Sequence, residues 1–155
     1  MQKSETPLYI LQHISTLLAR DIDQILLEQL GIGNTQFKIM EVIYSNPKPK
    51  QKFIAFALGQ TEAAISRQIR VLVKMGVIRM VIDSRNRRVH MAILTQKGHR
   101  MTEAASDIIE KYYSPFLKSL HSKKQDQLLE LLKIIDKNIC KFDHNTSYIN
   151  YITAN

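Results

Sequence analysis

Residues 51–94 read QKFIAFALGQTEAAISRQIRVLVKMGVIRMVIDSRNRRVHMAIL, and this stretch decides the fold. Its apolar residues predict a short helix from about Gln51 to Leu58, and Gly59-Gln60 then forms a tight turn. Thr61 caps a second helix that continues to about Met75, because a hydroxyl oxygen can accept a hydrogen bond from the first helical turn. Gly76 ends that helix, since glycine tolerates the left-handed conformation beyond a helix end.

Two apolar segments separated by a polar turn complete the stretch. Val77–Ile82 is rich in β-branched residues, and Val89–Leu94 alternates loosely between apolar and polar side chains. The pair is therefore predicted to be a β-hairpin, with Arg85, Arg87 and Arg88 in its turn. A short helix, a glycine turn, a second helix and a basic hairpin, in this order, are the parts of a winged helix-turn-helix.

Two helices are predicted upstream of this unit. Apolar residues recur at spacings of three and four from about Leu8 to Leu30, and the segment 31–34, with two glycines, ends this helix. Thr35 is predicted to cap the second helix, which stops before Pro47. The segment Asn46–Lys50 is then a loop, as its prolines and lysines indicate.

Two more helices are predicted downstream. Thr95 caps a long helix that runs toward Tyr112 or beyond, and Pro115 is expected to bend or end it. The last helix extends from about Ser122 to Ile139 and has its leucines and isoleucines on one side. The chain is therefore predicted to be mainly α-helical with a small β-hairpin, and to form a single domain over residues 1–155.

The positive charge of the chain is concentrated in the predicted winged helix-turn-helix. The net charge is +8, with 22 Lys and Arg against 14 Asp and Glu. Residues 60–100 hold nine basic groups against two acidic ones, a net of +7, whereas residues 1–59 hold six and five, and residues 101–155 hold seven of each. Such a concentration favours a polyanionic partner such as nucleic acid. A solvated basic face that keeps the protein soluble is the alternative.

The helix from Thr61 to Met75 has one face suited to the DNA major groove. Ile65, Ile69 and Leu72 fall at positions i, i+4 and i+7 and are predicted to face the core. Small residues on the opposite side allow close approach to base edges, and hydroxyl and guanidinium groups can bind bases or phosphates. A serine and an arginine exposed only to water are the alternative. The predicted contact residues on this helix are Thr61, Glu62, Ala63, Ser66, Arg67 and Arg70.

The arginines of the predicted hairpin turn favour a second contact, with the minor groove. A narrow minor groove has a deep negative potential that attracts an inserted arginine. Arg85, Arg87 and Arg88 therefore join the predicted DNA-binding residues. A polar hairpin tip that points into solvent is the alternative.

At residues 8–140 the sequence resembles the MarR family, the multiple-antibiotic-resistance type of transcriptional regulator. No single motif is decisive, but their order and spacing together are specific. Asn86 stands where the family usually has an aspartate that braces the wing arginine; asparagine can still accept a hydrogen bond but carries no charge. The motifs that carry the resemblance are Ile54-Ala55, Leu58-Gly59, Ile65-Ser66-Arg67, Leu72 with Met75-Gly76-Val77-Ile78-Arg79, Asp83-x-Arg85-Asn86-x-Arg88 and Leu94-Thr95-x-x-Gly98.

The resemblance implies how such a chain acts. The helix from Thr61 would lie in the major groove of double-stranded DNA, and Arg85 would reach the minor groove. Residues 35–94 would be the winged helix-turn-helix lobe, and the helices of residues 8–30 and 95–140 would interleave with a second copy in a homodimer. Independently, the apolar stripes of the first and last helices exceed what a small monomer needs. A twofold dimer implies an inverted-repeat operator.

Relatives of this family often bind small anionic or aromatic effectors between the dimerisation helices and the DNA-binding lobe. A role in core packing is the alternative for each candidate in this chain, as is a regulator without an effector. The candidate residues for an effector pocket are His13, Leu17, Met40, Tyr44 and Met101.

The sequence gives no indication of an enzyme, a cofactor or a metal site. Its histidines do not pair at i, i+4, and no phosphate loop, nucleophile elbow or paired-acid arrangement is present. Cys140 is the only cysteine, so it cannot form an internal disulfide; it lies far from the first helix, where a peroxide-sensing branch of the family has its reactive cysteine. A buried, inert thiol is the favoured interpretation of Cys140, and a redox role is the alternative. Residues 141–155 are either a frayed tail or a short docking segment.

The predicted function is that of a sequence-specific, DNA-binding transcriptional regulator, with repression as the favoured sign. The sequence has no run of 18 apolar residues and no signal peptide, so no membrane association and a cytoplasmic location are expected. Two alternatives stay open: an architectural DNA-binding protein of low specificity, and a winged-helix module that binds other proteins.

Overall fold

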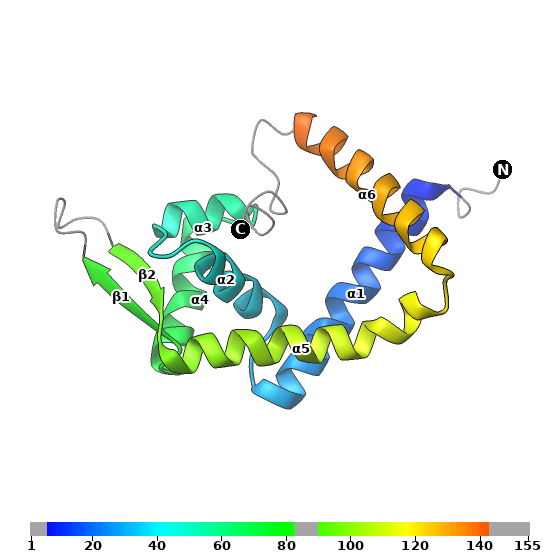
Figure 1. Cartoon of the computed structure of the whole chain (residues 1–155). Coiled ribbons are helices and arrows are strands. Elements are labelled where there is room, and N and C mark those ends of the chain that lie inside the picture. The colour runs from blue at the N-terminus through cyan, green and yellow to red at the C-terminus, as the bar shows by residue number, and fades with distance from the viewer. Residues whose placement is uncertain (1–5, 83–89, 143–155) are drawn as a thin grey trace.

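The computed structural model describes the backbone of residues 6–82 and 90–142, where six helices and two strands follow one another. Figure 1 shows the hairpin at one end, α1 and α6 at the other, and α5 running between the two ends. This architecture confirms the predicted fold class, mainly α-helical with a small β-hairpin. The elements are α1 (Pro7–Leu30), α2 (Asn34–Ser45), α3 (Gln51–Ala57), α4 (Glu62–Lys74), β1 (Ile78–Ile82), β2 (His90–Leu94), α5 (Gln96–Lys118) and α6 (Ser122–Phe142).

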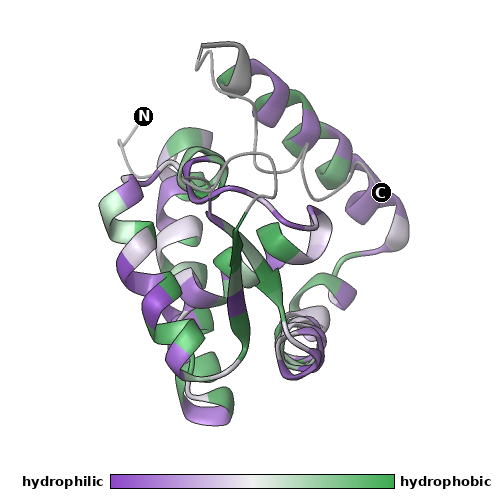
Figure 2. Cartoon of the chain, turned by 90° about the vertical axis from the view of Figure 1, so that its left-hand side faces the viewer, coloured by the Kyte–Doolittle hydropathy of each residue, from purple (hydrophilic) through white to green (hydrophobic). Residues whose placement is uncertain are grey.

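One hydrophobic core lies in the part of the chain that we call the lobe: α2, α3, α4, the two strands, the C-terminal half of α1 and the N-terminal half of α5. It forms because each helix turns its apolar stripe inward. Figure 2, viewed from the hairpin end, shows both strands coloured as hydrophobic and the surrounding helices mixed. The largest fully buried side chains are Leu26, Ile32, Ile39, Met40, Val42, Ile54, Ile65, Ile69, Leu72, Val77 and Ile78.

The hairpin is an antiparallel pair in which Ile78 faces Leu94 and Ile82 faces His90. A further backbone segment adds to it: the N–H of Ala92 donates to the carbonyl of Pro49 at 3.0 Å, and Lys50 forms an isolated bridge with Met91. The loop before α3 was predicted as a loop only. Its contact with β2 fixes the hairpin to the start of α3.

One predicted helix boundary is wrong, and one of the two outcomes expected at Pro115 is excluded. Thr35 does not cap α2, because Gly33 is the N-cap and the side chain of Gln36 accepts a hydrogen bond from the Gly33 N–H at 3.0 Å. Pro115 was expected to bend or end α5, and the ending is excluded because the helix continues through it to Lys118. A proline one turn before a helix end removes only one backbone hydrogen bond, so the helix can continue.

Gly98, in the first turn of α5, lies against the segment between α4 and β1. A Cβ atom at this position would lie 2.1 Å from the carbonyl oxygen of Val77. Thr95 caps α5, its Oγ1 accepting from the N–H of Gly98 at 3.1 Å, as predicted. The glycine therefore allows α5 to begin directly against the segment that joins α4 to β1.

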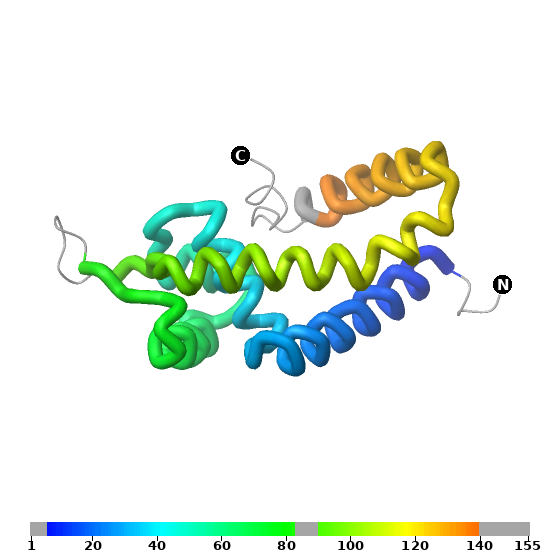
Figure 3. The backbone as a smooth tube through the Cα atoms, turned by 60° about the horizontal axis from the view of Figure 1, so that its bottom comes forward, coloured from blue at the N-terminus to red at the C-terminus, as the bar shows by residue number. Residues whose placement is uncertain are grey.

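The remaining parts of the long helices, which we call the arms, extend away from the core. They are the N-terminal half of α1, the C-terminal half of α5 and all of α6. Figure 3 shows α1 beside the distal part of α5 and α6 running back from the end of α5. The helix α6 makes only slight contact with the rest of the described chain. The arm residues that expose large apolar side chains include Leu8, Ile10, Ile14, Leu18, Tyr112, Phe116, Leu117, Leu129, Leu131, Ile134, Ile135 and Ile139.

Candidate nucleic-acid interface

The helix α4 begins at a turn that is set by the sequence. Gly59 has a φ of +60°, in the left-handed region, and the N–H of Gln60 donates to the carbonyl of Ala55 at 2.9 Å. Oγ1 of Thr61 accepts from the N–H of Ala64 at 3.2 Å, which confirms the predicted cap. The turn therefore fixes where α4 starts relative to α3.

The two faces of α4 have the predicted orientation. Ile65, Ile69 and Leu72 are buried, with at most 1% of their surface exposed. The opposite face carries exposed Thr61, Glu62, Ala63, Arg67 and Arg70, with Ser66 half-buried.

The arginines of this face lie along the helix and are available to a partner. Arg67 Nε donates to the carbonyl of Ala63 at 3.3 Å, and Arg70 Nε to that of Ser66 at 3.4 Å. Neither guanidinium forms a salt bridge with a residue in the described ranges. Both charges can therefore pair with an external anion without first losing an internal one.

The C-terminal end of α4 is held by side chains from the start of α5. Gly76 has a φ of +72°, and its carbonyl accepts from Thr95 Oγ1 at 2.7 Å. The ammonium of Lys97 donates to the carbonyl of Met75 at 2.8 Å, where a positive charge is favourable at the negative end of the helix dipole. These contacts fix the orientation of α4 relative to α5.

Further exposed cations lie at the end of α4 and on the elements next to it. Lys74 ends the helix and Arg79 lies on β1, while Lys50 and Lys52 lie at the start of α3. The acidic residue of this surface in α4 is Glu62, in the first turn, where a carboxylate is favourable to the helix dipole. Exposed basic residues therefore outnumber acidic ones on α4, on β1 and at the start of α3.

The predicted wing residues Arg85, Arg87 and Arg88 lie outside the described residues. The strands on either side are placed, and the pair Ile82–His90 marks where segment 83–89 leaves and rejoins them. The minor-groove contact therefore stays a prediction.

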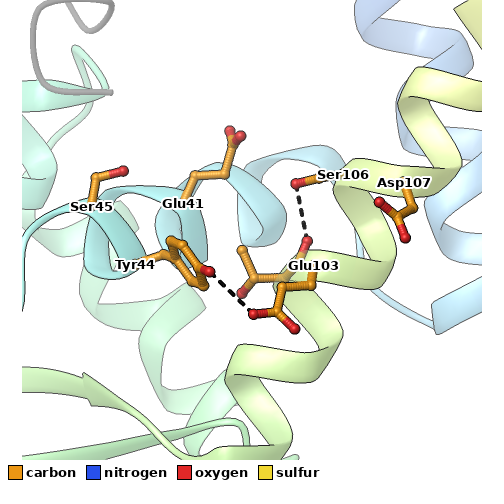
Figure 4. Close-up of a pocket in the computed structure, with 7 residues that line it drawn as sticks. Glu41, Tyr44, Ser45, Glu103, Ser106 and Asp107 are labelled. Carbon is orange, nitrogen blue, oxygen red and sulfur yellow. Dashed lines mark hydrogen bonds between the residues drawn. The ribbon is translucent and has the colours of Figure 1, made fainter. Parts of the chain in front are cut away.

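A groove of about 450 Å³ lies between α2 and α5 (Figure 4). The Tyr44 hydroxyl donates to Glu103 Oε1 at 3.1 Å, and the Tyr44 ring lies 5.4 Å from the His99 ring. This hydrogen bond, and the negative charge of Glu103, raise the pKa of Tyr44 above its usual value. The lining contains three carboxylates and no basic residue; it consists of Glu41, Tyr44, Ser45, Thr102, Glu103, Ser106 and Asp107.

Among the predicted effector residues, only Tyr44 lines this groove. Met40 is fully buried in the core, and Met101 is packed against it. On α1, Leu17 is half-buried, and His13 is exposed and stacks on Tyr9 with ring centroids 6.3 Å apart. The packing of α2 on α5 forms the groove, so its carboxylates could not be identified from the spacing within either helix alone.

Within residues 6–82 and 90–142, no group of three or more His, Cys, Asp or Glu side chains is placed to hold a metal ion. No helix of this part of the chain has the length and apolarity that a membrane span requires.

Comparison with known proteins gives a family match that falls within the lobe. Residues 32–90 match the model of the MarR family. The chain is 29% identical over 112 residues to the HTH-type transcriptional regulator BilQ of Clostridium symbiosum, an alignment that covers 71% of this chain and 75% of BilQ.

Solved structures agree with this assignment. MepR, a transcription regulator of the Staphylococcus aureus multidrug efflux pump MepA, superposes with a TM-score of 0.71 at 25% identity, covering 86% of this chain and 98% of MepR. MepR in a complex with DNA gives a TM-score of 0.72 at 26% identity, covering 84% and 96% of the two chains. The predicted resemblance in sequence and in fold is confirmed.

Proposed function

Because this chain is of the MarR type in its sequence pattern and fold, we propose that it is a homodimeric transcriptional regulator that binds an inverted repeat in duplex DNA. The observation that carries the proposal is the exposed face of α4, with Arg67 and Arg70, directly opposite the buried stripe of Ile65, Ile69 and Leu72. The complex of the related MepR with DNA supports the same partner for this chain.

In this proposal the two sides of the interface have different roles. Ala63, Ser66 and Arg67 on α4 contact base edges in the major groove, which differ among all four base pairs. Arg70 and the lysines near α3 contact phosphates, which supply affinity without sequence preference. Arg85, with Arg87 and Arg88, is assigned to the minor groove on the basis of the sequence alone.

The exposed apolar arms support the homodimer. Leu131 and Ile139 of α6 are 59% and 61% exposed, and Phe116 of α5 is 63% exposed. Exposure of many large apolar side chains is typical of an interface. A second copy that covers these arms would pair two lobes about a twofold axis, with half-sites about one helical turn of DNA apart.

We further propose that the groove between α2 and α5 is the effector site, and that the sign of regulation is repression. Glu103, Asp107 and Glu41 favour a cation, and the half-exposed ring of Tyr44 offers it a π face. This charge favours a cationic effector over the anionic class common among relatives. A ligand between α2 in the lobe and α5, which continues into the arm, would change the angle between the two.

A matched pair of small probes tests the effector site without DNA. Benzyltrimethylammonium is expected to bind the protein and raise its melting temperature, whereas benzoate, an anion of similar size, is not. The double variant Glu103→Gln/Asp107→Asn should lose the response to the cation. Equal responses to both probes, or an unchanged response in the variant, would refute the assignment.

Selection from a random duplex pool tests the main proposal. We expect an inverted repeat, bound about a thousandfold or more tightly than unrelated DNA at the same salt concentration. Tight binding without a preferred sequence would instead indicate an architectural protein. Absence of the steep salt dependence that phosphate contacts impose would indicate a protein-interaction module.

A further inference from the structure

We propose that Gln36 is a positioning residue that sets the rotation of α4 about its own axis, and that Asp23 on α1 controls Gln36. The proposal rests on the function proposed above, because the rotation of α4 decides which side chains face DNA. It concerns a chain of hydrogen bonds from α1 through the start of α2 to α4, formed by Asp23, Asn34, Gly33, Gln36 and Gln68.

The first link joins α1 to the start of α2. Oδ1 of Asp23 accepts from the N–H of Asn34 at 2.8 Å. The approach is close, since a Cβ atom at Gly33 would lie 2.9 Å from the same carboxylate oxygen. Asn34 Nδ2 also donates to the carbonyl of Ala19 at 3.4 Å. A carboxylate at a helix N-terminus is stabilised by the helix dipole, so Asp23 holds the first turn of α2 against α1.

The second link fixes the orientation of the Gln36 amide. Its Oε1 accepts from the N–H of Gly33 at 3.0 Å, in a capping-box arrangement. Because the oxygen is engaged at the cap, the amide nitrogen points the other way, toward α4. There Nε2 donates to Oε1 of Gln68 at 3.2 Å.

The bond between Gln36 and Gln68 restricts the rotation of α4. Ile65, Ile69 and Leu72 hold the helix through apolar contact, which is not directional and tolerates small rotations. An amide hydrogen bond is directional and weakens steeply when misaligned. Gln68 lies beside the buried stripe, so its bond to Gln36 selects one rotation and thereby aims Ser66 and Arg67.

The consequence is a physical connection between the arms and the DNA-binding face. A shift of α1 changes the position of Asp23, and with it the start of α2 and the Gln36 amide. This connection consists of side-chain hydrogen bonds of Asp23 and Gln36, so substitutions of these polar side chains can break it and leave the apolar core intact.

Two single variants and their combination test the Gln36–Gln68 bond. In Gln36→Glu, Gln68 can turn its amide and donate to the carboxylate; in Gln68→Glu, Gln36 still donates. The double variant has two acceptors and no donor between them. We expect each single variant to keep the parent's preference for the selected operator over unrelated DNA within about twofold, and the double variant to lose about tenfold.

Asp23→Ala tests the connection to α1. In the parent it should lower the operator preference by about threefold, and in the double variant it should have no further effect, because effects through one route are not additive. Similar melting temperatures of all variants would separate positioning from unfolding. A double variant with the same preference as the singles, or an additive effect of Asp23→Ala, would overturn the proposal.

Amide hydrogen exchange without DNA provides a readout that does not depend on the proposed function. The double variant should exchange faster than either single variant in the first turns of α4. If the parent prefers no duplex but exchange follows this pattern, the proposed function fails and the bond's role in holding α4 stands. If exchange in α4 is the same in all variants, the positioning role fails whatever the DNA result.

Discussion

The two halves of the same long helices differ in how they are stabilised. In α1, Leu26 is fully buried in the lobe, whereas Ile14 is 44% exposed in the arm. In α5, Ala105 is fully buried, whereas Phe116 is 63% exposed. Both halves are amphipathic, but the arm halves leave large apolar side chains exposed, although they touch where the Tyr113 hydroxyl of α5 donates to the carbonyl of Leu18 in α1 at 3.4 Å. The lobe thus has a complete core, whereas the exposed side chains of the arms would be covered by the second copy in the proposed dimer.

The largest expected effect comes from placing charge on the arms. Leu131→Asp combined with Ile135→Asp should convert the proposed dimer to monomers, because two carboxylates cannot be buried in an apolar interface. Operator affinity should fall by more than about a hundredfold, since the two lobes then bind their half-sites independently. Sedimentation equilibrium and DNA titration measure both effects.

Val73→Asp is the matched control for this change. Val73 is an exposed apolar residue of α4 in the lobe, 39% accessible, and its replacement should leave the protein dimeric. If the Val73→Asp variant dissociates, or if the Leu131→Asp/Ile135→Asp variant stays dimeric, the arms are not the dimer interface.

Within the lobe, the largest effect is expected at Gly98. Gly98→Ala would place Cβ 2.1 Å from the carbonyl oxygen of Val77, and we expect the free energy of unfolding to fall by about 3 kcal/mol. Gly31→Ala is the control: its φ is +69° but no atom lies within 4 Å of the added Cβ, so about 1 kcal/mol is expected. Urea unfolding of both variants gives the comparison; equal losses would mean that α5 does not approach Val77 closely.

The order of elements could be predicted from the sequence because the determining signals are local. Thr61 and Thr95 cap the helices that follow them, and glycines 31, 59 and 76 have positive φ angles at helix ends. The inward stripe of α4 follows from its spacing alone.

The features that were missed depend on contacts between distant segments. The start of α2 was misplaced because a carboxylate of α1, Asp23, and the side chain of Gln36 stabilise its first turn, rather than Thr35. The groove with Glu103 is formed by two helices whose relative packing the sequence does not specify. The bridge between Lys50 and Met91 is a single pair with no periodic signal.

On the DNA-binding face of the lobe, an intermediate effect is expected. Arg67→Ala should weaken operator binding by about 2 kcal/mol if the guanidinium contacts a base, and should relax the preference at that position of the site. Lys111→Ala, which removes an exposed charge from α5, should change little. DNA titrations at one fixed salt concentration measure both. If neither Arg67→Ala nor Arg85→Ala costs more than about 1 kcal/mol, the assignment of these residues is wrong.

The smallest effect is expected at the cap of α4. Thr61→Ala removes the oxygen that accepts from the N–H of Ala64, and should lower the free energy of unfolding by about 1 kcal/mol. Thr61→Ser keeps the hydroxyl oxygen and should stay close to the parent. Urea unfolding with an unchanged slope would confirm that only stability changed. If serine and alanine at this position are equally destabilising, the methyl group rather than the cap matters. The start of α4 would then be fixed by the Gly59 turn and by its contacts with α2 and α3.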